Sequence, residues 1–165
     1  MKKLIYLLVI SLSIVLMGCG KNKKLEEYNV AVSAFITSVS DITSTMENID
    51  TASESAETEL LGCLDSMQEE FRVFAELDVP SKFSGIESLA DEASSYMNEA
   101  VALYHEVFEA EEFDESKAGA ANENYSRAMQ RLSYISSLLQ GELPEGANIT
   151  ITEEDATDFT PIEEE

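Results

Sequence analysis

Residues 84–110 read SGIESLADEASSYMNEAVALYHEVFEA, and their apolar side chains recur in steps of three and four. Such steps place these side chains on one stripe of an α-helix, so a helix is predicted over about residues 84–112. The stripe alternates large and small residues, which favours the close approach of a neighbouring helix. Ser84 to Glu87 has the spacing of a capping box and follows Phe83, so the helix is expected to start there. The stripe consists of Ile86, Leu89, Ala93, Tyr96, Ala100, Leu103, Val107 and Ala110.

A second stripe follows directly and predicts a helix over about residues 115–140. Asp114 is a good N-cap residue, and Phe113 is expected to pack on Ala118 as a hydrophobic staple. Gly141 stands where a left-handed C-cap residue belongs, and Pro144 confirms the stop. Residues 142–165 hold nine acids and no base, which predicts a disordered, solvated acidic tail. The apolar members of this helix are Ala118, Ala121, Tyr125, Ala128, Leu132, Ile135 and Leu139.

Two more stripes precede residue 80 and predict helices over about residues 24–49 and 53–78. Thr51 to Glu54 has the spacing of a capping box and indicates the start of the later one. Val79-Pro80 ends it, because proline disfavours helical geometry in the residue before it. The first stripe is Leu25, Tyr28, Val32, Phe35, Val39, Ile42, Met46 and Ile49, and the second is Leu60, Leu64, Met67, Phe71 and Phe74.

The break near Asp50 has an alternative, since the first stripe continues in phase through Leu60 and Met67 without glycine or proline. One continuous helix of about 54 residues would be roughly 80 Å long. Helices average about 11 to 12 residues, so a turn near Asp50 is preferred. Four amphipathic helices with short connections bury their stripes best against one another. The expected fold is therefore all-α: an antiparallel up-down four-helix bundle over residues 25–141.

The N-terminus has the layout of a secretory signal peptide: Lys2 and Lys3, an apolar run from Leu4, and Leu16-Met17-Gly18-Cys19 at its end. This stretch resembles the bacterial lipoprotein signal. The resemblance implies cleavage between Gly18 and Cys19, a diacylglyceryl group on the Cys19 sulfur, and acylation of the new amino terminus with a fatty acid such as palmitate. Residues 1–18 are then a signal peptide and residues 19–24 a lipidated tether. The alternative, an uncleaved membrane anchor, is disfavoured because residues 4–17 are fewer than the roughly 20 needed to span a bilayer.

Charge restricts the partners of the chain. Residues 1–18 hold two lysines and no acid, so their removal takes the formal net charge from −23 to −25. Nucleic acid is excluded as a partner, because affinity for a polyanion comes mainly from Lys and Arg. Lys21, Lys23 and Lys24 lie beside Cys19, where cations favour an anionic membrane surface. We expect a monomer at the cell membrane, held by its lipid on the extracytoplasmic face.

Candidate chemistry is sparse. A di-iron bundle needs Glu-x-x-His, and Ala102 occupies the position three before His105, the one histidine of the sequence. Haem held by His105 and a methionine is disfavoured, because methionine at helical spacing is usually core filler. Cys63 is expected to be a small buried hydrophobe, since a lipidated Cys19 leaves it without a partner. The sequence therefore predicts no catalytic residue, no metal site and no cofactor.

These observations predict a lipid-anchored, extracytoplasmic binding or scaffold protein of the bacterial cell envelope, with a protein partner and no catalytic activity. Small bacterial lipoproteins with helical bodies look similar. The alternative is a lipoprotein that binds a small ligand or metal ion in a pocket between helices 84–112 and 115–140, where alanines leave room. Tyrosines at a binding groove would favour the protein partner. They are Tyr28, Tyr96, Tyr104, Tyr125 and Tyr134.

Overall fold

The structure is a computed structural model that describes residues 23–141, and all of the regular structure in this range is helical. The prediction of an all-α fold with four helices is confirmed. The expected signal peptide, Gly18, Cys19 and the acidic tail lie outside the described residues. The helices are α2 (Lys23–Glu47), α3 (Ala56–Ala75), α4 (Ser84–Phe108) and α5 (Glu115–Leu139), and a short 3₁₀ helix, η2 (Ser81–Phe83), precedes α4.

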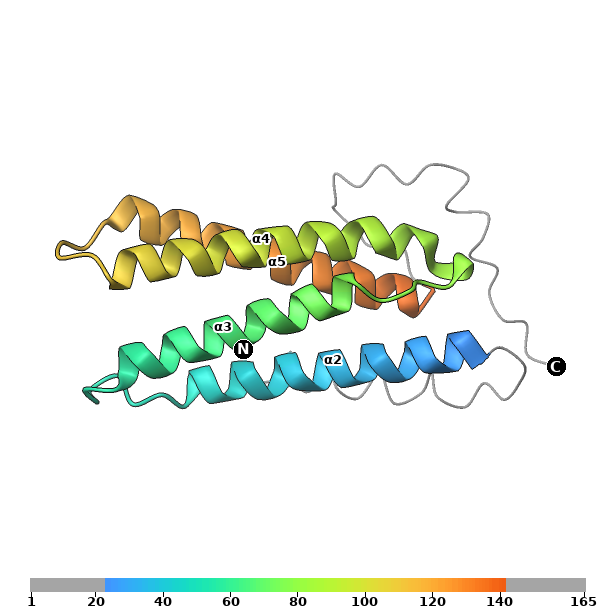
Figure 1. The fold of residues 1–165 in the computed structure, drawn as a ribbon, viewed down its shortest axis with the longest axis horizontal. Coiled ribbons are helices and arrows are strands. Elements are labelled where there is room, and N and C mark those ends of the chain that lie inside the picture. Colours follow the sequence, from blue (N-terminus) through green and yellow to red (C-terminus); the bar gives the residue numbers. More distant parts are fainter. Residues whose placement is uncertain (1–22, 142–165) are drawn as a thin grey trace.

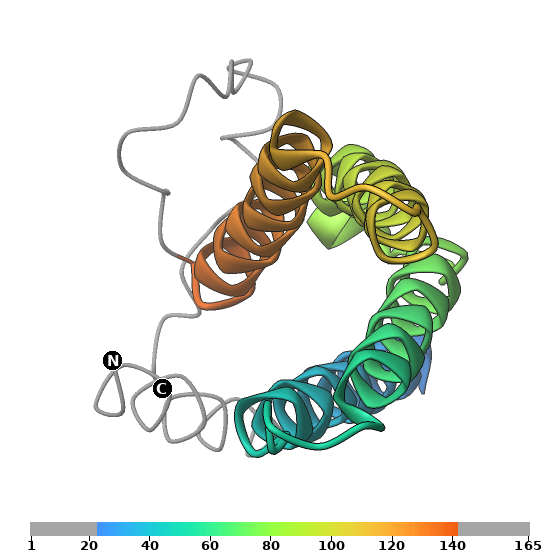
Figure 2. The same ribbon diagram turned by 90° about the vertical axis from the view of Figure 1, so that its left-hand side faces the viewer.

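Consecutive helices run in opposite directions and pack on one another, α2 on α3, α3 on α4 and α4 on α5 (Figure 1). Viewed along the helices, the four follow one another around an arc (Figure 2). Within the described residues, the backbones of α2 and α5 make few close contacts with each other. Both helices instead contribute side chains to the same hydrophobic core, among them Phe35 of α2 and Leu132 of α5. The chain thus forms two helical hairpins, α2–α3 and α4–α5, joined along α3 and α4.

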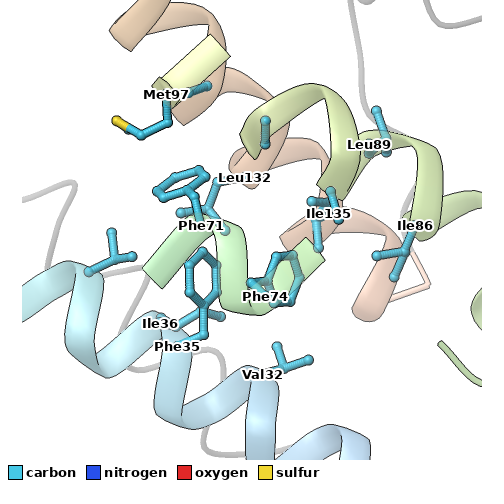
Figure 3. Packing of buried hydrophobic residues seen from close by; sticks show 14 of the residues in the cluster. Val32, Phe35, Ile36, Phe71, Phe74, Ile86, Leu89, Met97, Leu132 and Ile135 are labelled. Carbon is cyan, nitrogen blue, oxygen red and sulfur yellow. The ribbon is translucent and has the colours of Figure 1, made fainter. Parts of the chain in front are cut away.

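All four helices supply side chains to one hydrophobic core. Phe35 of α2 stacks on Phe74 of α3, with ring centroids 4.2 Å apart, and meets Phe71 edge-on at 5.3 Å (Figure 3). Offset and edge-to-face rings are the favoured aromatic geometries, so these three rings stabilise the α2–α3 hairpin. The largest side chains with almost no exposed surface are Phe71, Leu64, Met67, Ile86, Met97, Ile135 and Val101.

The α4–α5 hairpin is the most extensive helix pair and is built on small residues. Ala90, Ala93 and Ala100 of α4 are buried, and so are Ala121 and Ala128 of α5. Alanine lets two helix backbones approach closely, which the alternation of large and small residues predicted. The alanines therefore lie in the contact between α4 and α5.

Two helix starts differ from the prediction. Helix α3 begins at Ala56, because residues 50–55 form turns in which the Asp50 carboxylate accepts a hydrogen bond from the Ala52 N–H at 3.0 Å. Side chains of this kind compete with helix formation by bonding to nearby backbone groups. The Ser55 hydroxyl donates to the Glu59 carboxylate at 2.6 Å and does not cap the helix. The capping box at Thr51 to Glu54 is thus wrong, whereas the turn near Asp50 is confirmed.

The capping box predicted at Ser84 is also wrong, because Ser84 is already helical and Phe83 occupies the N-cap position. Phe83 is buried and stacks on Tyr28 at 6.1 Å, so tertiary packing fixes this end of the helix. Helix α4 ends at Phe108, not near residue 112. The acids at positions 109, 111 and 112 follow directly, and negative charge is unfavourable at a helix C-terminus.

The remaining ends lie close to their predicted positions. The Asp114 carboxylate accepts a hydrogen bond from the Lys117 N–H at 3.0 Å, as expected of an N-cap. Gly141 has φ 75°, and its N–H donates to the Leu138 carbonyl at 3.0 Å, which confirms the left-handed C-cap. The hydrophobic staple is wrong, because Phe113 is 71% exposed. Helices α2 and α3 end two and three residues earlier than predicted, at Glu47 and Ala75.

Candidate functional site

A polar groove of about 560 Å³ lies between α3 and α4. Its residues on α3 recur in steps of three and four and therefore share one face of that helix. The adjoining faces of the two helices carry the core residues Met67, Phe71, Ala93 and Met97. The groove is thus the outer, solvated side of the contact that joins the two hairpins. Its lining consists of Asp65, Gln68, Glu69, Arg72, Ala75, Asp91, Ser94, Ser95 and Asn98.

Arg72 is the one cation in the groove lining, and carboxylates hold it on two sides. Its Nε and Nη2 donate to the two oxygens of Glu69 at 2.8 and 2.7 Å, and its Nη1 donates to Glu76 at 2.6 Å. This forked arrangement is the strong form of a guanidinium–carboxylate pair. The hydrogen bond and charge of Arg72 lower the pKa of Glu69, and the two acids raise the pKa of Arg72 above its usual range. On the α3 side of the groove, the positive charge of Arg72 thus offsets the negative charge of Glu69.

Two bonds cross from α3 to α4. The Gln68 amide donates to the side-chain oxygen of Asn98. Nearby, the Nε2 of His105 lies 2.7 Å from an Asp65 oxygen, and its Nδ1 lies 3.2 Å from a Glu109 oxygen. Hydrogen bonds to Asp65 and Glu109 raise the pKa of His105 above its ordinary value of 6.5. The sequence placed His105 outside the apolar stripe and did not reveal its partner on α3.

The α4 side of the groove is less occupied. Asp91 makes no salt bridge with any described residue, and the hydroxyls of Ser94 and Ser95 make no hydrogen bond in this part of the chain. A carboxylate beside two hydroxyls can accept hydrogen bonds from an ammonium group or coordinate a hard cation weakly. Both nitrogens of His105 face carboxylates, so neither is paired with a hydroxyl or thiol as nucleophilic catalysis requires.

The other predicted candidates lie apart from the groove lining. Cys63 is a free, half-buried thiol on α3, less buried than expected. The sequence placed a pocket between the helices now seen as α4 and α5, yet the groove lies on the α3 side of α4. Among the described residues, no group of three or more His, Cys, Asp or Glu is arranged to hold a metal ion.

The tyrosines of the described helices lie in the hydrophobic core or pack against it, and none of them lines the α3–α4 groove. Tyr28 and Tyr134 are buried in the core. The guanidinium groups of Arg127 and Arg131 both lie 5.6 Å from the ring centroid of Tyr96. Cations over an aromatic face are attracted by the ring, so this cluster fastens α5 to α4. A salt bridge from Arg131 to Glu92 at 2.6 Å strengthens the same contact.

Sequence reasoning missed the groove, although one of its signals was present. Asp65, Glu69 and Arg72 recur at helical spacing opposite the apolar stripe, as a solvated face also would. Their neighbours on α4 follow only from the packing of the two helices.

No described helix is long and apolar enough to cross a membrane. Comparison of the chain with protein-family models, curated proteins and solved structures found no match.

Proposed function

We propose that this protein is a lipid-anchored binding or scaffold protein on the extracytoplasmic face of a bacterial cell membrane, and that it is not an enzyme. The observation that carries the proposal is the stretch Leu16-Met17-Gly18-Cys19 behind a short basic and apolar leader. Cys19 bears the lipid, and Gly18 is the last residue removed. Two or more acyl chains are needed for stable anchoring, as lipidation of both the sulfur and the new amino terminus provides.

The position of the anchor at one end of the helices supports this proposal. Helix α2 begins at Lys23, four residues after Cys19, so the anchor joins the bundle at one end. The turns α2–α3 and α4–α5 lie at the opposite end (Figure 1). A helix of 25 residues is about 37 Å long, so these turns stand roughly that far from the anchored end. This distance presents the turns to partners in the envelope.

Phe113, in the α4–α5 turn, is our candidate for the partner contact. Its ring is 71% exposed between Glu112 and Asp114, and large aromatic side chains are enriched at protein interfaces. An apolar ring among acids suits a basic protein surface with an apolar pocket. Cross-linking in the native membrane should recover such a partner, and Phe113→Ser should lose it. Val73→Ser, which changes an exposed residue of α3, should retain it.

The anchor has a direct test. Metabolic labelling with a palmitate analogue should mark the wild-type chain and leave Cys19→Ala unlabelled. Cys63→Ser is the matched control, because it removes the other cysteine and should keep the label. Labelling of Cys19→Ala at the wild-type level would contradict the proposed anchor.

The second candidate function is capture of a small cation in the α3–α4 groove, which the uncompensated Asp91 favours. Titration calorimetry with spermidine and with Ca²⁺ should detect binding that Asp91→Asn weakens. Glu99→Gln removes an acid of α4 that does not line the groove, so it should have a smaller effect. Equal losses in the two variants would indicate non-specific attraction to the acidic surface.

A further inference from the structure

His105 lies between two carboxylates, one on α3 and one directly after the end of α4. Asp65 reaches it from α3, with its oxygen 2.7 Å from Nε2. Glu109, the C-cap residue directly after α4, lies 3.2 Å from Nδ1. The His105 side chain is 33% exposed, so the site is accessible to solvent protons while the ring is held in place. Both ring nitrogens are therefore occupied by acceptors.

This arrangement requires a particular protonation state. A neutral imidazole has one N–H donor and one acceptor nitrogen, whereas an imidazolium has two donors. Ionised carboxylates can only accept hydrogen bonds. With a neutral ring, one nitrogen lone pair would face a carboxylate lone pair at hydrogen-bonding distance. With both carboxylates ionised, the geometry therefore favours the positively charged form of His105.

The charged groups around His105 favour the same form. Helix α3 contributes Asp65, and the C-cap of α4 contributes Glu109. The cation that α5 brings to this end of the bundle, Lys117, is bonded to Glu106 at 2.8 Å. These surroundings raise the pKa of His105, with the hydrogen bond to Asp65 as the largest cause.

We infer that His105 is a pH-sensitive latch that holds α3 against α4 while its ring is protonated. Loss of the proton leaves a single donor for two carboxylates and removes the charge from the bond that crosses to α3. A charge-assisted hydrogen bond is roughly twice as strong as a neutral one, so the latch weakens as the pH rises. Asp65 also lines the α3–α4 groove, so the same step makes that end of the groove more negative. The latch is a property of the folded body and does not depend on the lipid anchor.

NMR titration of the His105 ring in the full chain tests the latch directly. The midpoint should lie above 6.5 in the wild-type protein and should fall on Asp65→Asn and on Glu109→Gln. The fall should be greater for Asp65→Asn, because Asp65 makes the shorter bond. A wild-type midpoint at or below 6.5 would overturn the proposal. A midpoint that responds to Glu109→Gln but not to Asp65→Asn would also overturn it, since the contact would then be local to α4.

The folding equilibrium provides a second measurement. A histidine whose pKa is raised by folding stabilises the protein fully below the unfolded value of about 6.5 and loses this effect as the pH rises through the folded value. The ratio of the folding equilibrium constants of wild type and His105→Gln should therefore be larger at about pH 5.5 than at about pH 9. Lys117→Gln breaks a neighbouring ion pair whose cation does not titrate in this interval, so its ratio should stay nearly constant. An equal ratio at both pH values for His105→Gln would refute the latch.

Discussion

Replacing Tyr28 by Phe should stabilise the protein. Tyr28 is 3% exposed, and no described group forms a hydrogen bond with its buried hydroxyl. A buried polar group without a partner costs about 1 to 3 kcal/mol. Removing the oxygen forfeits about five dispersion contacts of about 0.1 to 0.2 kcal/mol each, which is roughly 0.5 to 1 kcal/mol. The stacking of the ring on Phe83 is kept, so we expect a net gain of about 1 kcal/mol in the free energy of unfolding.

Chemical denaturation of the full chain measures this gain, and Tyr134→Phe is the control. Tyr134 is also a buried residue, but among the described residues only Tyr28 has a buried hydroxyl that lacks a hydrogen-bond partner. Removing the Tyr134 hydroxyl should therefore give no comparable gain. A loss of more than about 1 kcal/mol on Tyr28→Phe would refute the reasoning, because it would mean that the hydroxyl has a partner worth that much.

The pH dependence of stability in alkaline solution tests the burial of the Tyr28 hydroxyl independently. Burial raises the pKa of Tyr28 from 10.0 to about 12. Between these values the unfolded chain loses the phenol proton while the folded chain keeps it, so folding becomes less favourable as the pH rises. Two pKa units correspond to roughly 3 kcal/mol. The folded phenol is itself half ionised at pH 12, so the stability of wild type relative to Tyr28→Phe should fall by roughly 2 kcal/mol between pH 9 and pH 12. Parallel curves would contradict the burial of this hydroxyl.

Three further substitutions test the packing and the helix ends by thermal or chemical denaturation. Asp114→Ala removes the N-cap bond to Lys117 and should cost about 1 kcal/mol, whereas Asp114→Asn keeps an acceptor and should stay near wild type. Phe71→Ala leaves a cavity in the core and should cost about 3 to 5 kcal/mol, against less than about 0.5 for the exposed Val73→Ala. Ala128→Leu should cost about 1 to 3 kcal/mol by forcing α4 and α5 apart. The same change at exposed Ala120 should be nearly neutral. Equal effects at both positions would exclude close packing as the cause.

The helical stripes could be predicted because periodicity reports burial directly. Phe71, Ile86 and Ile135 lie on their predicted stripes and are almost fully buried. Asp114 and Gly141 were also predicted correctly, since each acts through bonds within a few residues of itself. The capping box at Ser84 failed because the packing of Phe83 on Tyr28, 55 positions away in the chain, fixes where the helix begins.

The candidate site was harder to predict for the same reason. The spacing of His105 and Glu109 on one helix face is visible in the sequence, but Asp65 lies 40 residues earlier. Only the packing of α3 on α4 brings it to the ring. The groove depends on that packing too, since residues of both helices line it. Buried alanines between α4 and α5 such as Ala93 and Ala128, by contrast, lie on stripes that the sequence already shows.

The chemistry of the three helix contacts indicates where the body can rearrange. The contact α2–α3 is closed by stacked aromatic rings, and α4–α5 is closed by alanines and by the arginines over Tyr96. The contact α3–α4 also has an apolar inner side, but its outer side is held by polar bonds from Gln68 and His105. Apolar packing changes little between pH 5 and 9, whereas a histidine bond changes greatly in that interval. A change in pH therefore acts on the junction between the two hairpins before it acts within either one, and this junction is where the groove lies.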